Sequence, residues 1–524
     1  MTKHKVSVLV IGAGPTGLTF CLEMLHNRCR GSVLLVDANE WSRDADVLPK
    51  GQYVNSRTME LWGRYGDGRL PTIIRSKKKH ACTNHVINVS TDKVAWQDVS
   101  LSAVSREEAT RVPQYAYENV LRDHLCDEMS CCDFATKWGF EAVNIERGSI
   151  SNWTVTFKQS LKHVAIAGVD GLNSATTDEN LFQVHADYLV GCDGGKSFVR
   201  HSLFPKMEGI GALGFSLMVL FSSESMYQHL RSRVLELNQN TPDGMMYFFK
   251  KAHTPGGIGI LEGTEKFYAG VSFPDESKVP AEFLRKDINW SDPQVLKSVS
   301  NFITATIGVD QVSDVAPTAA FLWKPYSLCS PHWINDESSV FLAGDAAHLL
   351  SPTGGMGMNS GVEDAVNLGW KMAAKLNDWN PDLLLSYESE RKIAWKRYME
   401  FQNEMIDAQM TTMRNYSNAP YAIFGEGMDK VVVGSRIPYS EFQDGKNSFS
   451  VLNPLGYTVI LVLPCAKTEA ITKWVEQCKA PIEMASVIAN DLFKEQDLIV
   501  VRPDQMVSCI TQAANIEQIP FPYL

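Results

Sequence analysis

The sequence predicts an α/β protein that combines a parallel-sheet domain at its start with an antiparallel sheet in the middle of the chain. Residues 6–11 form an uninterrupted apolar run that leads into glycines and then into a helical pattern over residues 19–25. A second apolar run covers residues 32–36, as expected for buried parallel strands joined by a helix. Residues 208–320 instead alternate apolar and polar positions over several short runs, which is typical of antiparallel strands.

The bulk properties are those of an ordinary globular protein with two or three domains. The chain has 524 residues, of which 44% are hydrophobic and 21% charged. Its net charge of -11 argues against nucleic acid or an anionic membrane as the main partner. No apolar run approaches the ~20 residues that cross a bilayer, and the N-terminus lacks the pattern of a secretory signal. We therefore expect a cytoplasmic protein with no nucleic-acid partner and no membrane span.

The cysteines give no sign of a metal centre. The chain has 11 of them, without metal-ligand spacing and without a Cys-x-x-Cys pair. Without a secretion signal they are expected to be free thiols in a reducing compartment. We expect no metal site.

The first motif is the glycine turn between the two N-terminal apolar runs. Its glycines have the G-x-G-x-x-G spacing, and an acid ends the second run twenty residues after the last of them. The first glycine makes the tight bend, the second lets the backbone approach a pyrophosphate, and the third lets helix and strand pack. An ordinary tight turn would not need this register. The acid would repel a 2′-phosphate, which leaves FAD or NAD. The predicted contacts are Gly12, Gly14, Pro15, Thr16, Gly17 and Asp37.

Two later segments also place an acid at the end of an apolar run. One run ends at residues 192–195, before a helical pattern, and another ends at residues 344–345. The second is followed by Gly354, Gly355 and Gly357 and then by a long helical pattern. Helix capping alone explains one of these glycines but not three. Backbone N–H groups and a helix N-terminus at this loop would form a cradle for negative charge.

With these motifs in this order, the chain resembles the single-component FAD-dependent aromatic hydroxylases of the para-hydroxybenzoate and phenol hydroxylase type, in their polyketide hydroxylase-like branch. Three segments carry the resemblance: GAGPTG at 12–17, CDGGKSFVR at 192–200, and GDAAHLLSPTGGMGMNSGVEDAVNLGWKMA at 344–373. It extends to QYVNSRTMELW, PQYAYENVLRDHL and SYESERK, so that the motifs together span residues 1–400.

The resemblance implies which residues hold FAD. Asp345 would bind hydroxyls of the ribityl or ribose, and the glycines after it would reach the edge of the isoalloxazine. A helix from about residue 360 would aim its positive end at the pyrimidine side of the ring. Gln52 stands where the family usually has an arginine or a small residue. The implied FAD contacts are Arg57, Gln114, Arg122, Asp193, Gly194, Gly344, Asp345, Pro352, Gly354, Gly355, Gly357, Met358 and Asn359.

The resemblance also assigns the antiparallel sheet, which would roof the flavin and hold a flat substrate. Its aromatic side chains suit that role, although each of them would equally suit the core of a sheet. Tyr247 is our candidate for contact with a phenol. Together with Pro352, which matches the family's flavin-contacting proline, it forms our predicted catalytic pair.

The C-terminal part resembles the thioredoxin-like third domain of the same branch, through GSRIPYSEF at 434–442 and RPD at 502–504. It has no Cys-x-x-Cys, so no redox role follows. The expected domains are FAD-binding (1–207 and 321–425), substrate-binding (75–110 and 208–320) and thioredoxin-like (426–524). A monomer or a homodimer is expected.

The implied activity is that of an FAD-dependent monooxygenase. NADPH or NADH would reduce FAD and leave, and O2 would be the cosubstrate. One oxygen atom would enter a phenolic, polyketide-like aromatic substrate through a flavin C(4a)-hydroperoxide. Baeyer–Villiger insertion or epoxidation on the same scaffold remains open. A flavin halogenase is less favoured because no Trp-x-Trp-x-x-Pro segment is present. Intact glycines and acids argue against an inactive nucleotide-binding regulator.

Overall fold

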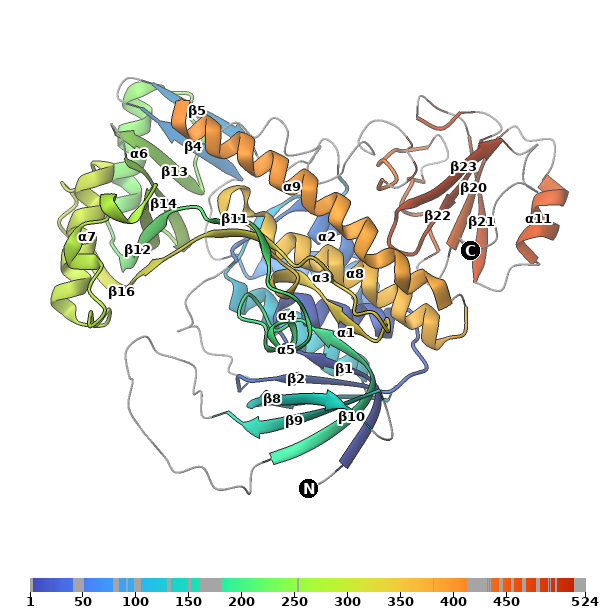
Figure 1. The fold of residues 1–524 in the computed structure, drawn as a ribbon. Helices are drawn as coiled ribbons and strands as arrows, with labels where there is room; N and C mark the ends of the chain where they lie inside the picture. The colour runs from blue at the N-terminus through green and yellow to red at the C-terminus, as the bar shows by residue number, and fades with distance from the viewer. Residues whose placement is uncertain are drawn as a thin grey trace.

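The computed structural model describes residues 3–40, 51–78, 84–90, 93–98, 105–129, 133–148, 152–160, 181–251, 254–379, 381–411 and, with short gaps, 431–512. Its strands form three main sheets, which Figure 1 shows in separate parts of the molecule. The sheet that contains the N-terminal strand lies at the bottom of that view. The sheet of the middle of the chain lies at the upper left, and that of the C-terminal region at the upper right.

The first sheet has the order β7-β2-β1-β10-β9-β8, and β18 pairs with β10. Strands β7, β2, β1, β10 and β18 run parallel, whereas β9 and β8 are antiparallel additions. Strands β2 and β18 and the second half of β1 are buried on both faces, so they appear in the sequence as continuous apolar runs. The bounds are β1 Lys3–Ile11, β2 Val33–Asp37, β7 Phe134–Trp138, β8 Phe140–Arg147, β9 Trp153–Gln159, β10 Leu181–Gly191 and β18 Val340–Leu342.

Two helices come after strands of this sheet whose ends carry the predicted glycine motifs. Helix α1 (Pro15–His26) follows β1, and helix α8 (Met356–Leu376) follows β18 and packs against α1. Helix α9 (Ser386–Thr411) then runs back along the molecule. The other helical segments are α2 Ser56–Trp62, η1 Gly66–Gly68, α3 Leu70–Ser76, α4 Gln114–Met129, α5 Phe198–Leu203, η5 Gly344–Ala346, η6 Thr353–Gly355 and η7 Pro381–Leu385.

The middle sheet has the order β16-β12-β15-β14-β13-β4-β5. All its pairs are antiparallel except β13 with β4. Side chains of α6 and α7 cover one face and form a core with it, and Figure 1 places both helices on its outer side. The bounds are β4 His85–Val89, β5 Val94–Asp98, β12 Phe215–Ser222, α6 Met226–Leu237, β13 Met246–Lys251, β14 Thr254–Glu262, β15 Lys266–Phe273, η3 Glu276–Lys278, η4 Ala281–Phe283, α7 Pro293–Ile307 and β16 Ala316–Trp323.

Two small sheets lie outside the three main ones. One contains β11 (Glu208–Ala212), β17 (Tyr326–Cys329) and β19 (His348–Leu349), of which β11 comes after β10 and β19 after β18. The other pairs β3 (Tyr53–Val54) with β6 (Thr110–Arg111). These short pairings hold the long connections between the first and middle sheets in place.

The C-terminal sheet has the order β21-β20-β22-β23, with β21 parallel to β20 and the remaining pairs antiparallel. Trp370 and Ala374 of α8 belong to the same apolar cluster as Tyr457, Val459 and Leu461 of β20. This region therefore shares a core with the helix that follows β18. The bounds are β20 Tyr457–Leu463, α11 Thr468–Glu476, β21 Ile482–Ile488, β22 Asp497–Val501 and β23 Val507–Gln512.

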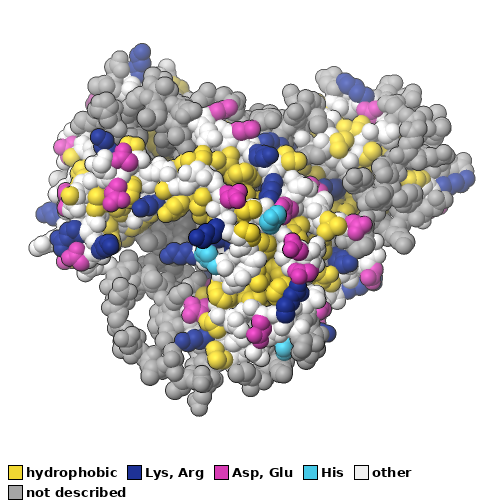
Figure 2. Space-filling model, in the orientation of Figure 1, with side chains coloured by type: hydrophobic (Ala, Val, Ile, Leu, Met, Phe, Trp, Pro, Cys, Tyr) yellow, Lys and Arg dark blue, Asp and Glu magenta, His cyan; other side chains and the backbone are white. Residues whose placement is uncertain are grey.

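The surface that Figure 2 shows carries acidic and basic side chains that are interspersed rather than gathered by sign. Among the described residues, no helix combines the length and apolar character needed to cross a bilayer.

Candidate active site

The glycine turn after β1 is packed against the end of β10. Gly12 has a φ of 103°, and a Cβ on it would lie 2.3 Å from the carbonyl oxygen of Cys192. A Cβ on Gly17 would lie 1.9 Å from the carbonyl oxygen of Gly12. Any side chain at either position would push the turn away from the sheet. These two glycines are therefore required by close approach and, at residue 12, by backbone conformation.

The N-terminus of α1 differs, because it faces open space. Gly14 is the N-cap, Pro15 is the first helical residue, and no side chain caps the first N–H groups. A Cβ on Gly14 would meet nothing within 4 Å. The first turn contains no acidic side chain that would compete with an anion. Free N–H donors at the positive end of a helix fit the diphosphate of a dinucleotide.

Asp37, at the end of β2, is tied to this turn. Its carboxylate accepts a hydrogen bond from the backbone N–H of Ala13 at 2.6 Å and another from that of Asn39 at 2.8 Å. Arg122 of α4 approaches the same turn, since its guanidinium lies 3.4 Å from the carbonyl oxygen of Ala13 and 3.2 Å from Glu118. The structure thus brings the predicted ribose acid and Arg122 to one loop.

The acid after β10, Asp193, has one carboxylate oxygen that can still accept a hydrogen bond. Asp193 Oδ2 accepts a hydrogen bond from the N–H of Val199 at 3.1 Å, but its buried Oδ1 has no partner among the described residues. Burial raises the pKa of Asp193 above its usual value. Gly194 has a φ of 78° and open space at its Cβ. A buried oxygen without a donor is the kind of atom that a ligand hydroxyl or water satisfies.

Arg200 of α5 joins this segment to the loop after β18. Its guanidinium donates to the carbonyl of Gly195 at 2.8 Å and to that of Ala346 at 2.9 Å. The two segments in which an acid follows a strand are therefore held side by side.

The loop after β18 lies directly on the first glycine turn. A Cβ on Gly344 would lie 2.6 Å from Thr16 Oγ1, and one on Gly361 of α8 would lie 2.5 Å from the same atom. Thr16 is therefore the contact point of all three elements. Asp345 is exposed, and one of its carboxylate oxygens lies 4.0 Å from the Cβ position of Gly357. This acid stands at the N-terminal end of α8, where ligand hydroxyls can reach it.

Helix α8 begins at Met356, four residues before the expected start. Gly354 and Gly355 have φ values of 79° and 70°, so the chain turns sharply and enters the helix earlier. A Cβ on Gly355 would lie 2.8 Å from the ring of Tyr53. Asn359 donates to the carbonyls of Tyr53 at 2.9 Å and Gly355 at 2.6 Å. It holds the segment before α2 against the glycine loop.

Comparison with known proteins agrees with this geometry. A family model described as FAD binding domain matches residues 5–402. The chain belongs to this FAD-binding family. Its cradle fits the cofactor, because uncapped N–H groups, the acids of three strand ends and a glycine loop at a helix N-terminus meet at one place.

Curated relatives of this FAD-binding chain are monooxygenases. An FAD-dependent monooxygenase of Emericella nidulans is 25% identical over 87% of this chain and 69% of its own length. A rifampicin monooxygenase of Rhodococcus hoagii is 27% identical over 74% of this chain and 67% of its own. Aklavinone 12-hydroxylase of Streptomyces peucetius is 26% identical over 83% and 81%.

A solved structure of similar fold is the ternary complex of aklavinone-11 hydroxylase with FAD and aklavinone. It superposes with a TM-score of 0.74 at 20% identity, covering 98% of this chain and 96% of the other. The predicted FAD-dependent aromatic monooxygenase is thereby confirmed, as are FAD as cofactor and the α/β fold of the aromatic hydroxylases.

Two predicted FAD contacts make other contacts in the structure. Arg57 of α2 is buried and donates to Gln505 at 2.5 Å and to the carbonyl of Asp504 at 2.8 Å, both in the C-terminal region. Gln114 accepts a hydrogen bond from the N–H of Gly51 at 2.8 Å, and Gly51 lies beside Met358. Their assignment to the flavin stays a prediction. The bonds of Arg57 favour a structural role between domains.

Tyr247, our candidate for contact with a phenol, lies in the core between the middle sheet and its outer helices. It is fully buried there, and its hydroxyl accepts a hydrogen bond from the N–H of Gly244 at 3.2 Å. This position favours the alternative interpretation of a core aromatic residue. Pro352 is exposed in the glycine loop, where a flavin can reach it.

The opposite face of the middle sheet carries apolar side chains that lie across glycines of neighbouring strands. Strand register aligns Met218 and Phe248 across Gly270 and Gly257 in one row. A Cβ on Gly270 would lie 2.1 Å from Met218 Sδ, so that side chain lies across the glycine. In the next row the ring of Tyr268 covers Gly259 in the same way. Half-buried side chains on this face are Met218, Leu220, Met246, Phe248, Tyr268 and Phe321.

Arg111 joins this face to the FAD-binding side, and sequence reasoning missed it. Its guanidinium lies 4.9 Å from the centre of the Tyr268 ring, donates to the Met245 carbonyl at 3.1 Å, and is held by Gln52 at 3.0 Å. Gln52 directly precedes Tyr53, which contacts Gly355. This face of the sheet and the glycine loop are thus neighbours. In the sequence, only Gln52 was noticed here, because it differs from the residue usual in the family.

A buried cluster of polar side chains, centred on Asp364, lies behind the glycine loop. Its carboxylate accepts hydrogen bonds from the N–H of Gly344 at 3.1 Å and from Arg391 at 2.7 Å, and lies 2.7 Å from His348 Nε2. Burial alone would raise the pKa of Asp364, but His348 and Arg391 lower it below its usual value. His348 is fully buried here, which fits a structural role. In the described part of the chain, no cluster of His, Cys, Asp or Glu could hold a metal ion.

Proposed function

We propose that the protein is an NAD(P)H-consuming hydroxylase that inserts one oxygen atom of O2 into a planar, phenolic, polyketide-like substrate. The observation that carries this proposal is the apolar face of the middle sheet beside the glycine loop. Glycines in two adjacent rows let aromatic and methionine side chains lie along the sheet. Such a surface complements a fused-ring system better than a compact aliphatic one.

The chain's own residues would bind FAD, orient the substrate and exclude water from the site. The turn of residues 12–17 and the N-terminus of α1 would hold the diphosphate of FAD, and Asp37 and Asp345 its hydroxyl groups. When bound, FAD supplies storage of two electrons from NAD(P)H and activation of O2. The N-terminus of α8 would place fixed dipoles near the side of the ring that becomes negative on reduction. The sheet face would hold the substrate ring against this position and keep water away.

The test measures, for the holoenzyme and a panel of aromatic polyketide phenols, how much hydroxylated product forms per NAD(P)H oxidised. We expect one phenol to accelerate NAD(P)H oxidation and to gain a single oxygen atom, which carries the label when ¹⁸O2 is supplied. Nuclear magnetic resonance of the product separates ring hydroxylation from ring expansion or epoxidation. Oxidation of NAD(P)H that yields only H2O2 with every phenol would contradict the proposal.

We further propose that the C-terminal region is a thioredoxin-like domain that lacks the redox pair. Strand β20, helix α11 and the parallel strand β21 form a βαβ unit, and β22 and β23 add antiparallel strands. That arrangement supports the resemblance at residues 434–442 and 502–504. The chain contains no Cys-x-x-Cys, which argues for a structural role.

A further inference from the structure

One face of α9 touches the flavin-binding elements at four levels. The hydroxyl of Tyr387 donates to the carbonyl of Leu342 at the end of β18, at 2.8 Å. Arg391 binds Asp364 at 2.7 Å, and Tyr398 binds Glu363 of α8. Gln402 reaches the glycine loop itself. These residues are four, seven and four positions apart, a spacing that places them on one side of a helix.

Gln402 holds the turn that contains Pro352. Its side-chain amide donates to the carbonyl of Ser351 at 2.7 Å and to that of Thr353 at 2.9 Å, one on each side of the proline. The side chain is 1% exposed, so water does not replace these bonds. Its own oxygen is buried without a partner among the described residues. The amide nitrogen must face the two carbonyls, because the oxygen would repel both.

The turn needs an external constraint. It continues into Gly354 and Gly355, both with positive φ, and glycines leave a chain many alternative conformations. Ser351 accepts a hydrogen bond from the N–H of Thr353 at 3.2 Å, which closes the turn locally but fixes it to no other element. The two bonds from Gln402 tie it to a 26-residue helix that is itself bound to β18 and α8.

We propose that Gln402 is a positioning residue that fixes the Ser351–Thr353 turn in the conformation that accepts the flavin. This inference rests on the proposed flavin site at the glycine loop. It adds the role of a residue that lies outside every motif of the sequence. A loop released from Gln402 spends less time in the competent conformation, and FAD affinity falls by that fraction.

The test compares two variants of Gln402 with a matched control. Gln402→Glu keeps the shape of the side chain but places a carboxylate against two carbonyl oxygens. Gln402→Met keeps most of the volume and removes both donors. Asn403→Asp makes the same amide-to-acid change at the adjacent exposed residue. The dissociation constant of FAD is measured for each apoprotein by flavin fluorescence between pH 6 and 8.5, and folding is checked by circular dichroism.

We expect Gln402→Glu to weaken FAD binding about tenfold at pH 8, which corresponds to the loss of one well-made hydrogen bond. The defect should diminish toward pH 6, because burial against two carbonyls raises the pKa of the new carboxyl and its protonated form donates one bond. Gln402→Met should stay weakened at every pH, and Asn403→Asp should match the wild type. The ionisable groups on this helix face, Arg391 and Tyr398 with Glu363 opposite, are common to all four proteins.

Wild-type affinity in folded Gln402→Met, or an equal and pH-independent defect in both variants, would overturn the proposal. The first result would show that the bonds are dispensable, and the second that only packing matters. If Gln402→Glu does not fold, Gln402→Met decides. Product formation by the wild type is a separate measurement. A wild type that binds FAD but hydroxylates nothing would refute the proposed function and leave the result on Gln402 standing.

Discussion

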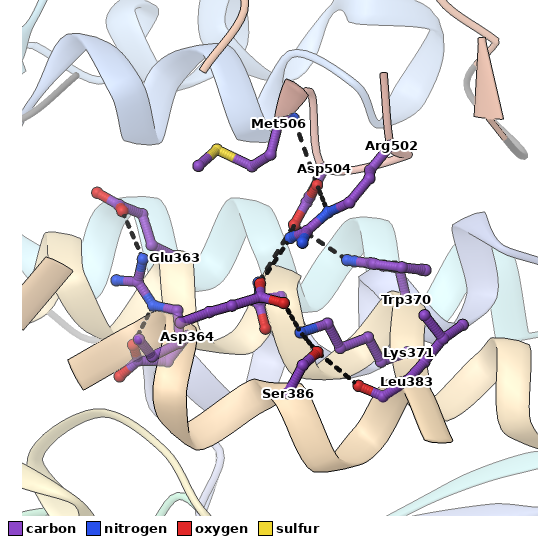
Figure 3. A network of polar contacts seen from close by, with 12 residues as sticks. Glu363, Asp364, Trp370, Lys371, Leu383, Ser386, Arg502, Asp504 and Met506 are labelled. Atoms are coloured by element: carbon purple, nitrogen blue, oxygen red, sulfur yellow. Dashed lines mark hydrogen bonds and ion pairs between the residues drawn. The ribbon is translucent and has the colours of Figure 1, made fainter. Parts of the chain in front are cut away.

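Replacing Asp504 with asparagine should loosen the C-terminal region from the flavin-binding core. Figure 3 shows Asp504, on the C-terminal segment, with its side chain directed toward α8. Its carboxylate accepts bonds from Trp370 Nε1 at 3.1 Å, from Arg502 at 2.5 and 3.0 Å, and from the N–H of Met506 at 3.3 Å. Asp504 is 3% exposed. An asparagine has one acceptor oxygen, so its NH2 group must face donors in either orientation.

The magnitude follows from what remains paired. Removing one partner of a buried ion pair costs about 3–5 kcal/mol. Arg502 keeps Glu390 at 2.8 Å, so the lower end of that range applies to this site. A loss of about 3 kcal/mol raises the equilibrium for local opening roughly 150-fold. Amides of β22 and β23 should therefore exchange hydrogen for deuterium about two orders of magnitude faster in Asp504→Asn.

The pH dependence gives the sign of the effect. Burial alone would raise the pKa of Asp504, but pairing with Arg502 lowers it. A carboxyl with a lowered pKa in the folded state stabilises fully above its unfolded pKa of about 4 and loses that contribution below it. The difference between wild type and Asp504→Asn should be constant from pH 8 to about 4 and shrink at lower pH. Glu483→Gln, on the exposed side of β21, is the control. Unchanged exchange in Asp504→Asn at pH 7 would refute the reasoning.

Three further predictions concern the glycine turn, the middle sheet and the carboxyl of Asp314. Gly14→Ala should leave the melting temperature of the apoprotein unchanged and weaken FAD binding, because the added Cβ has space only when no diphosphate is bound. Gly12→Ala should lower the melting temperature of the apoprotein, because the added Cβ would lie 2.3 Å from a carbonyl oxygen. Tyr247→Phe should cost about 1 kcal/mol of stability and leave the product formed per NAD(P)H unchanged, whereas Tyr268→Ala should lower that yield. The carboxyl of Asp314 accepts bonds from Ser225 and Ser223, which lower its pKa to about 2. Its contribution should be complete above about pH 4 and lost toward pH 2, so acid unfolding followed by circular dichroism should be steeper in wild type than in Asp314→Asn.

The sequence predicted the parts of the site that depend on local chain geometry. The first strand, the glycine turn and the first helix are consecutive in the chain. Their apolar patterns, and the acid at Asp37, can therefore be recognised from the local sequence. The start of α8 was placed four residues late because it depends on two left-handed glycines, which fix the entry into the helix without an apolar signal. Boundaries of this kind are decided by backbone conformation rather than by periodicity.

The sequence could not decide which face of a strand meets the core. Alternation in β13 shows that Tyr247 and Phe248 point to opposite faces. The choice between them is made by α7, whose apolar side of Val299 and Ile303 covers the face of Tyr247. Arg111 and Gln402 escaped notice for a related reason. Their partners lie 134 and 51 residues away along the chain, and no local pattern records such contacts.

Helix α8 connects the C-terminal region to the glycine loop of the proposed flavin site. Its buried side chains Asp364, Asn367 and Trp370 follow one another at intervals of three residues, so they lie along one side of the helix. Asp364 binds Arg391 of α9 behind the glycine loop, whereas Asn367 and Trp370 donate to Asp504 of the C-terminal region. Because each buried charge on α8 has partners on another element, the helix cannot shift along its axis without breaking several ion pairs at once. We therefore expect the C-terminal region to influence the proposed flavin site by fixing α8, whose N-terminus follows the glycine loop. Asp504→Asn should accordingly lower FAD affinity less than Gln402→Met does, because it frees the distant end of α8 and leaves the Ser351–Thr353 turn bound.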